Sequence, residues 1–507
     1  MNFRKITAFV LFFFITISLF SQQYSKREMR AVWIATVANI DWPSQSGLTP
    51  TQQRTEMRKM LDDLQQANIN TIVLQIRPTA DSFYPSDLEP WSNYLTGKQG
   101  QRPSPFYDPL QFIIEEAHKR CMEVHGWVNP YRVTNTPGQI NRLDKSHVYY
   151  KNKNLIVRYG DKYYFNPGLD ETREFLNKVV EDIVAHYDID GLHFDDYFYP
   201  YPEGNTDFPD EETFRENPRG FNSKADWRRN NVNMVIEELQ KTIKDLKPWV
   251  QFGVSPFGVW RNNTVDPEGS ATRAGVSNYD DLYADILKWL REGTVDYVVP
   301  QLYWEIGKKV ADYEVLIKWW SEHSYGKNLY IGLYASGLYE NKTTAWKNGN
   351  ELARQLKMNK SYPKTEGAVY FSAKTFLKNP RGLVDTLKNN YYKYPALQPI
   401  CKNIKGEASA QPQNIRVVKD GKEAYILWDD VEEDGGCKVA YYVVYGFKGK
   451  KIGDLNDPEN IVAITTENCI DLNAYEKKFK GRCSFVVTAV NRFKYESTPT
   501  EGVTRRL

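Results

Sequence analysis

Residues 188–200 read DIDGLHFDDYFYP, a short apolar run that ends in two adjacent carboxylates and an aromatic loop containing proline. The run alternates as a strand does, because His193 and Asp195 share one face while Phe194 and Asp196 share the other. It therefore predicts a buried strand that delivers acidic groups to one edge of a sheet.

Strand-like runs alternate with helical runs on both sides of this stretch. Further strands are predicted at 29–36, 69–77, 123–131, 251–256, 296–304, 328–335 and 367–373. Helices are predicted at 51–67, 109–120, 227–246, 279–292, 313–323 and 345–359, and one more is announced by the residues at 166–171 and runs to about 186. Parallel strands need helical crossovers, so this alternation predicts an α/β fold, a (β/α)8 TIM barrel with long insertions in its βα loops. A doubly wound sheet would require a phosphate-binding glycine fingerprint after the first strand, and the sequence has none there.

The predicted barrel spans residues 28–395, and a linker at 396–410 leads to a region of different character. From 411 to 507 the helical periodicity fades and short strands separated by turn signals replace it, which predicts a small all-β sandwich. Trp428 and the strand-like run YYVVY at 441–445 resemble a fibronectin type III domain.

The N-terminus has the pattern of an export signal. Arg4 and Lys5 precede an apolar run at 8–20, which is too short and too abruptly followed by polar residues for a spanning helix. We expect a signal peptide over residues 1–22. The mature protein is then exported, periplasmic or extracellular, with no membrane insertion after cleavage.

Charge and aromatic content limit the classes of molecule that this protein is expected to bind. The formal net charge is only +2 and no Lys/Arg run forms a basic stripe, so no nucleic-acid partner is indicated. The 13 Trp and 34 Tyr provide many rings of the kind that stack on sugars. Five cysteines fit an exported chain, and one pair among Cys437, Cys469 and Cys483 is left open.

Polar side chains recur where the predicted strands face the barrel axis. In this fold the active site lies at the C-terminal ends of the strands. The axis-facing polar or amphipathic residues there are Gln75, Arg77, His125, Trp127, Asn129, His193, Asp195, Ser255, Gln301, Tyr303 and Glu305. Burying so many polar groups without a polar cavity would be costly, so the set predicts a site.

Several motifs resemble those of the bacterial glycosyl hydrolase-like family 10. They are RAVWIAT at 30–36, RPTAD at 77–81, WVNPYR at 127–132, DGLHFDDYFYP at 190–200, SPFG at 255–258 and PQLYW at 300–304. That family includes exported enzymes acting on peptidoglycan glycan strands stripped of their peptides. The resemblance implies a TIM-barrel glycosidase and a polysaccharide substrate, most often a cell-wall glycan.

Glycoside cleavage needs one protonated carboxyl group and one ionised carboxyl group. We predict Glu305 as the general acid/base and Asp195 or Asp196 as the second carboxylate. Adjacent residues of a strand point to opposite faces, so Asp196 reaches the site only if the strand bends. The fourth strand also resembles chitinase-like family 18, but His193 replaces its second Asp and Tyr197 stands near its catalytic Glu.

A wider set is predicted to hold sugar hydroxyls, orient the acids or stack on sugar rings. Its members are Trp33, Arg77, Asp81, Asn129, Arg132, His193, Gln301, Tyr303 and Trp304. Neither a metal nor a cofactor is predicted.

Two other functions remain open from the sequence. The Asp-Asp strand end also resembles metal-dependent polysaccharide deacetylases, which need a pair of histidines on one helix face, and the six histidines provide no such i, i+4 pair. The other alternative is a non-catalytic glycan-binding protein on a degenerate barrel.

Overall fold

The computed structural model describes residues 24–421, 423–475, 479 and 481–506. The predicted signal peptide at 1–22 lies outside these residues. Within them, none of the helices combines the length and the apolar character needed to cross a membrane. All five cysteines are described and all are free thiols, so the pair left open among the last three is not formed.

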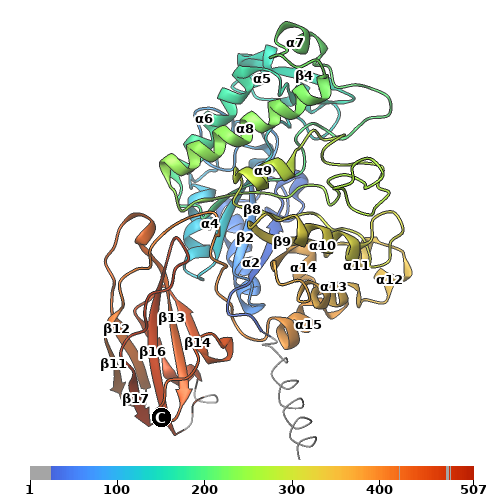
Figure 1. Cartoon of the computed structure of the whole chain (residues 1–507). Helices are drawn as coiled ribbons and strands as arrows, with labels where there is room; N and C mark the ends of the chain where they lie inside the picture. The colour runs from blue at the N-terminus through green and yellow to red at the C-terminus, as the bar shows by residue number, and fades with distance from the viewer. Residues whose placement is uncertain (1–23, 422, 476–478, 480, 507) are drawn as a thin grey trace, which may run out of the picture.

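Eight parallel strands close into a barrel in which chain order is also spatial order, and the last strand pairs with the first (Figure 1). The strands are β1 (Met29–Ile34), β2 (Thr71–Arg77), β3 (Glu123–Val128), β6 (Gly191–Phe194), β7 (Gln251–Val254), β8 (Tyr297–Val298), β9 (Asn328–Tyr334) and β10 (Thr365–Phe371). The predicted (β/α)8 barrel is confirmed.

Helices cover the outside of the barrel. The main ones are α2 (Pro50–Gln66), α4 (Pro109–His118), α6 (Asp170–His186), α8 (Lys224–Leu246), α9 (Ile286–Glu292), α10 (Tyr313–Glu322) and α13 (Glu351–Asn359). Helix α2 begins where the sequence favours it, because the Thr49 side chain accepts a hydrogen bond from the Gln52 amide and Pro50 occupies the first turn.

The structure shortens several predicted elements. The sixth strand was expected to reach 304, but β8 ends at Val298, because Pro300 has no amide hydrogen to continue the ladder. The helix expected over 345–359 is split into α12 (Thr344–Lys347) and α13, with Gly349 between them at φ +75°.

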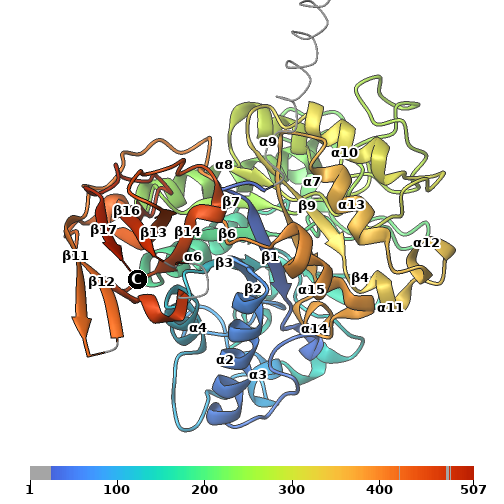
Figure 2. The same cartoon turned by 90° about the horizontal axis from the view of Figure 1, so that it is seen from below.

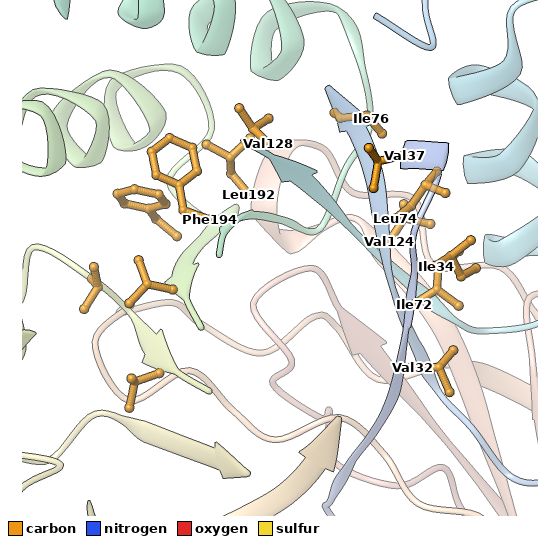
Figure 3. Packing of buried hydrophobic residues seen from close by; sticks show 14 of the residues in the cluster. Val32, Ile34, Val37, Ile72, Leu74, Ile76, Val124, Val128, Leu192 and Phe194 are labelled. Carbon is orange, nitrogen blue, oxygen red and sulfur yellow. The ribbon is translucent and has the colours of Figure 1, made fainter. Parts of the chain in front are cut away.

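Side-chain parity separates two cores. One alternate set of strand residues packs toward the helices, and Figure 3 shows part of it, including Val32, Ile34, Ile72, Leu74, Val124, Val128, Leu192 and Phe194. The other set fills the barrel interior and includes Trp33, Val73, Trp127, Tyr297, Tyr330 and Val369. The two-residue period of the sequence therefore assigns the correct face to these strand residues.

Long insertions rise from the C-terminal ends of the early strands. The loop after β3 carries a hairpin of β4 (Ile156–Tyr159) and β5 (Lys162–Phe165), and the loop after β6 carries α7 (Glu211–Glu216). These segments lie together at one end of the molecule in Figure 1.

The C-terminal strands form two antiparallel sheets in a lobe beside the barrel (Figure 1, Figure 2). The sheets consist of β11 (Gln413–Asp420), β12 (Glu423–Asp429) and β15 (Cys469–Asp471), and of β14 (Ile461–Thr465), β13 (Val439–Lys448), β16 (Arg482–Asn491) and β17 (Val503–Arg506). The predicted all-β region is confirmed.

The connecting segment is held against the barrel. Backbone hydrogen bonds join Leu397 to Lys26 and Glu28, and the Asn70 side chain donates to the Ala396 carbonyl at 2.9 Å. The two domains are therefore joined by a packed segment.

Candidate active site

Both adjacent carboxylates of the opening stretch reach one pocket. Strand β6 ends at Phe194 and the chain bends at Asp196, where the Phe198 amide donates to the Asp196 carbonyl at 3.1 Å. The pocket has a volume of about 210 Å³. It is lined by Trp33, Ala35, Val37, Ile40, Trp127, Arg132, Asp195, Asp196, Tyr197, Ser255, Gln301, Tyr303 and Phe371. The bend thus removes the strand's usual separation of neighbouring side chains.

Asp195 is almost fully buried, with 4% of its surface exposed. Burial raises the pKa of its carboxyl to about 7, and the Asp196 carboxylate acts in the same direction. The Arg132 guanidinium, the Tyr197 amide and the Asn129 side chain oppose this rise. Asp195 can therefore hold a proton near neutral pH, as a general acid must.

Asp196 has its own partners. The Tyr201 hydroxyl donates to Oδ2 of Asp196, and Gln301 also hydrogen-bonds this carboxylate. Burial raises the pKa of Asp196, while these two hydrogen bonds and the charge of Arg132 hold it down. Donors aimed at Asp196 favour its ionised form beside a protonated Asp195.

Asn129 is oriented by Gln75. The Gln75 side-chain oxygen accepts from the backbone amides of Thr36 at 2.9 Å and Val37 at 2.8 Å, so its amide nitrogen must face Asn129. That nitrogen donates to the Asn129 side-chain oxygen at 2.6 Å, which leaves the Asn129 amide nitrogen to donate to Asp195. Backbone donors thus fix the direction of a hydrogen bond to the candidate acid.

Two of the predicted sugar-binding residues lie outside the pocket lining. Arg77 is fully buried and forms a two-point ion pair with Glu89 at 2.5 and 2.7 Å, while also donating to the Asn129 carbonyl at 2.5 Å. Asp81 is bonded to Thr79 and Gln99, each at 3.1 Å, and burial raises its pKa to about 6. Arg77 supports the backbone that carries Asn129.

Three further predicted residues also fall outside the lining. His193 lies below Ser255, with Nε2 2.9 Å from the Ser255 hydroxyl. The Trp304 ring packs edge-on against Phe257. Glu305 accepts a hydrogen bond from Trp346 at 3.0 Å and pairs with Lys308 at 3.5 Å.

The remaining predicted residues line the pocket or contact its acids. Trp33, Arg132, Gln301 and Tyr303 belong to the lining, and Asn129 contacts Asp195 from the neighbouring strand. Trp127 and Ser255, which belong to the axis-facing set, also line it. The pocket therefore combines aromatic rings with a few polar groups around a carboxyl pair, as sugar-binding clefts do.

Tyr201, Ile40 and Phe371 were not anticipated as site residues. Tyr201 stands five residues after Asp196 in the aromatic loop, and the ring density of that loop was the available signal. Ile40 belongs to the loop after β1, and Phe371 is the last residue of β10. Among the residues that the structure describes, no group of three or more His, Cys, Asp or Glu side chains is arranged to hold a metal ion.

Known proteins are similar in sequence to this chain over most of its length. A family model described as glycosyl hydrolase-like 10 matches residues 28–349. The glycosyl hydrolase YngK of Bacillus subtilis (strain 168) is 41% identical over 500 residues, covering 97% of this chain and 96% of that protein. The glycosyl hydrolase DigH of Escherichia coli (strain K12) is 42% identical over 381 residues, covering 71% of this chain and 86% of that protein. Among solved structures, the PgaB (BpsB) glycoside hydrolase domain from Bordetella bronchiseptica aligns with 12% identity and a TM-score of 0.43, over 72% of this chain and 99% of that one.

Proposed function

This chain belongs to the glycosyl hydrolase-like 10 family, and from that premise we propose that it is an exported glycoside hydrolase that cleaves peptidoglycan glycan strands. The observation that carries the proposal is the pair of buried carboxyls at the pocket floor. Asp195 has a pKa of about 7, and hydrogen-bond donors surround Asp196. One protonated and one ionised carboxyl are what glycoside cleavage requires.

The proposed roles follow from these environments. Asp195 donates its proton to the leaving glycosidic oxygen, and the Asp196 carboxylate supports the positive charge that develops on the sugar or activates the attacking group. Glu305, the acid expected from the sequence, is bonded to Trp346 and Lys308. This placement favours Asp195 and Asp196 as the working pair.

The pocket walls fit a sugar. Trp33, Trp127 and Tyr303 provide ring faces and edges for stacking, and Gln301 and Ser255 provide polar atoms for hydroxyl groups. Arg77 and His193 act behind this surface, since Arg77 holds the backbone of Asn129 and His193 contacts the Ser255 hydroxyl.

Arg132 supports an acidic glycan as the substrate. It is a cation among the lining residues, and its charge lowers the pKa of both carboxyls. Glycan strands stripped of their peptides carry a free lactyl carboxylate on alternate sugars, whereas chitin carries none. A guanidinium pairs well with such a group.

We further propose that the chain is a glycosidase barrel over residues 28–395 followed by a fibronectin type III-like module from 411, with 396–410 between them. Sheets of three and four antiparallel strands support that reading of the module. The charged start and apolar run of residues 1–22 support export.

Incubation of the full mature chain with peptide-free peptidoglycan strands, chitin and acetylated polysaccharides, followed by mass analysis of the products, tests the proposal. We expect shortened glycans from the peptidoglycan strands and a weaker reaction with chitin. Release of acetate without chain shortening, abolished by a chelator, would instead identify a metal-dependent deacetylase. Binding of the strands without any product would identify a non-catalytic glycan-binding protein.

A further inference from the structure

A line of hydrogen bonds runs down the barrel axis from the pocket floor. Ser255 lines the pocket, and its hydroxyl lies 2.9 Å from Nε2 of His193. Nδ1 of His193 lies 3.0 Å from the Tyr297 hydroxyl, which lies 2.7 Å from Nδ1 of His125. Nε2 of His125 is 3.2 Å from a carboxylate oxygen of Glu123. We call these five residues the axial chain.

The axial chain ends on a side chain of the C-terminal domain. Lys494, in the turn after β16, forms an ion pair with the other oxygen of Glu123 and lies 3.9 Å from Asp190. Only 3% of Lys494 is exposed. Burial alone would lower the pKa of Lys494, but the two carboxylates raise it, so the ammonium stays charged. The lobe that carries Lys494 lies beside the barrel in Figure 2.

The two ends of the axial chain dictate the same direction of donation. Trp33 Nε1 is only a donor and lies 3.3 Å from Nε2 of His193, so that nitrogen is an acceptor and the His193 proton is on Nδ1. His193 then donates to the Tyr297 oxygen, and the Tyr297 hydroxyl donates to Nδ1 of His125. At the other end the Glu123 carboxylate is only an acceptor, so His125 carries its proton on Nε2. Both ends of the axial chain therefore require His193 to be protonated on Nδ1 and His125 on Nε2.

The surroundings keep His193 neutral and pack the rings of the axial chain tightly. Burial lowers the pKa of His193 well below its usual range, and a nearby His125 charge would lower it further. Two glycines provide the space that the rings occupy. A Cβ on Gly191 would lie 2.7 Å from Nδ1 of His125, and one on Gly253 would lie 2.0 Å from the Tyr297 ring.

We propose that Lys494 of the C-terminal domain is a positioning residue for the active site, which acts by holding the Glu123 carboxylate in place as the acceptor at the end of the axial chain. Trp33 at one end of the axial chain and the Lys494–Glu123 pair at the other support the same direction of donation, in which Ser255 donates its hydroxyl proton to His193 and presents its lone pairs to the pocket. The Ser255 hydroxyl therefore accepts a hydrogen bond from a sugar hydroxyl. The opposite tautomer of His193 would turn Ser255 into a donor toward the sugar.

This inference gives the C-terminal domain a part in the site, and its effect on turnover rests on the proposed function. The domain interface also contains Arg492, which pairs with Asp188 at 2.5 Å without touching the axial chain. Arg492→Gln is therefore a matched control, since it removes an interdomain ion pair and leaves Glu123 and Lys494 in place.

The direction of donation can be measured by two-bond ¹H–¹⁵N correlation spectra of the full chain labelled in its histidines. The wild type should show His193 protonated on Nδ1 and His125 protonated on Nε2. Lys494→Met removes the cation that holds the Glu123 carboxylate in place, so Nε2 of His125 loses its fixed acceptor and the His125 spectrum should depart from the purely Nε2-protonated pattern. Arg492→Gln and Lys494→Arg should keep the wild-type spectra.

Glu123→Gln is a second variant for the case in which Lys494→Met does not fold. Lys494 would bind the amide oxygen of the new glutamine side chain. The amide nitrogen of that glutamine would then donate to Nε2 of His125, and the His125 proton would move to Nδ1. Unchanged histidine spectra in a folded Lys494→Met or Glu123→Gln variant would overturn the proposal.

Turnover provides the other readout. We expect Lys494→Met to change kcat or KM on glycan strands by about 5- to 10-fold, as loss of one oriented hydrogen bond implies, and Arg492→Gln to change neither. Shifted spectra with unchanged kinetics would overturn the positioning role. An inactive wild type would overturn the proposed function, while the spectra would still decide the direction of the axial chain.

Discussion

The side-chain amide of Asn129 donates to Oδ2 of Asp195, although 66 residues separate the two in the sequence. Neighbouring barrel strands place them together, because β3 pairs with β6 and each residue follows the end of its strand. This contact joins the candidate acid to a side chain whose orientation backbone amides fix.

Removal of either candidate carboxyl should abolish most of the activity. We expect Asp195→Asn and Asp196→Asn to lower kcat on peptide-free glycan strands by about 10²- to 10⁴-fold, the usual effect of an acid or base. Glu305→Gln is the comparison. Because Glu305 is hydrogen-bonded to Trp346 and ion-paired with Lys308 outside the pocket lining, we expect a much smaller loss of kcat. A loss with Glu305→Gln that matches the other two would restore Glu305 as the acid.

The pH profile should report the proton on Asp195. Because its pKa is about 7 and the protonated form is the one that works as an acid, kcat should fall as pH rises above about 7. Arg132 lowers this pKa, so Arg132→Gln should move the basic limb upward by up to about one pH unit. The shift is measured as kcat at saturating substrate. If the basic limb of Arg132→Gln lies at the same pH as that of the wild type, the limb does not report the ionisation of Asp195.

The ionisation of Asp195 should make the folded protein less stable as pH rises, whereas a carboxylate in a buried salt bridge loses its stabilising effect as pH falls. The folded Asp195 keeps its proton to about pH 7, whereas the unfolded carboxyl loses it near 3.8, so the free energy of unfolding falls as pH rises between these values. Asp195→Asn has no carboxyl to ionise at this position, so this part of the fall in the free energy of unfolding is absent from the variant. Relative to wild type, its free energy of unfolding should gain on the order of 2–4 kcal/mol from pH 4 to pH 8 in urea titrations. An equal difference at both pH values would contradict the raised pKa.

Tyr201→Phe tests the partner of Asp196. The variant loses one hydroxyl that donates to a buried carboxylate, so the pKa of Asp196 should rise further and the ionised form should become scarcer. We expect kcat to fall roughly 10- to 100-fold with the fold intact, because a hydrogen bond to a charged group contributes about 1.5–3 kcal/mol. Tyr199→Phe, in the same loop but outside the pocket lining, serves as the control for general loop effects.

The Arg77–Glu89 pair should act mainly on stability. Arg77→Met leaves the Glu89 carboxylate buried and unpaired, so the free energy of unfolding should fall by about 3–5 kcal/mol. The double change Arg77→Met with Glu89→Leu removes both charges and should cost less than the single change, as a thermodynamic cycle by urea titration would measure. A double variant less stable than the single one would contradict this account.

The sequence alone determined the barrel and the face of most strand residues, but not that of Glu305 beyond the sixth strand. Alternation with a period of two is a local property, so the sequence assigns Asp195, Gln301 and Tyr303 to the axis, and the family resemblance assigns Arg132 to the site. The same rule left the position of Asp196 open, because a bend is set by what the loop packs against.

Only the tertiary structure decided which of the conspicuous residues meet. It brings Asp196 to Asp195 through the bend, and it places Glu305 against Trp346 rather than in the pocket lining. It also brings Lys494 of the last domain to Glu123 at the base of the barrel. These contacts join segments far apart in the chain, and the packing of whole elements sets them, so no local period encodes them.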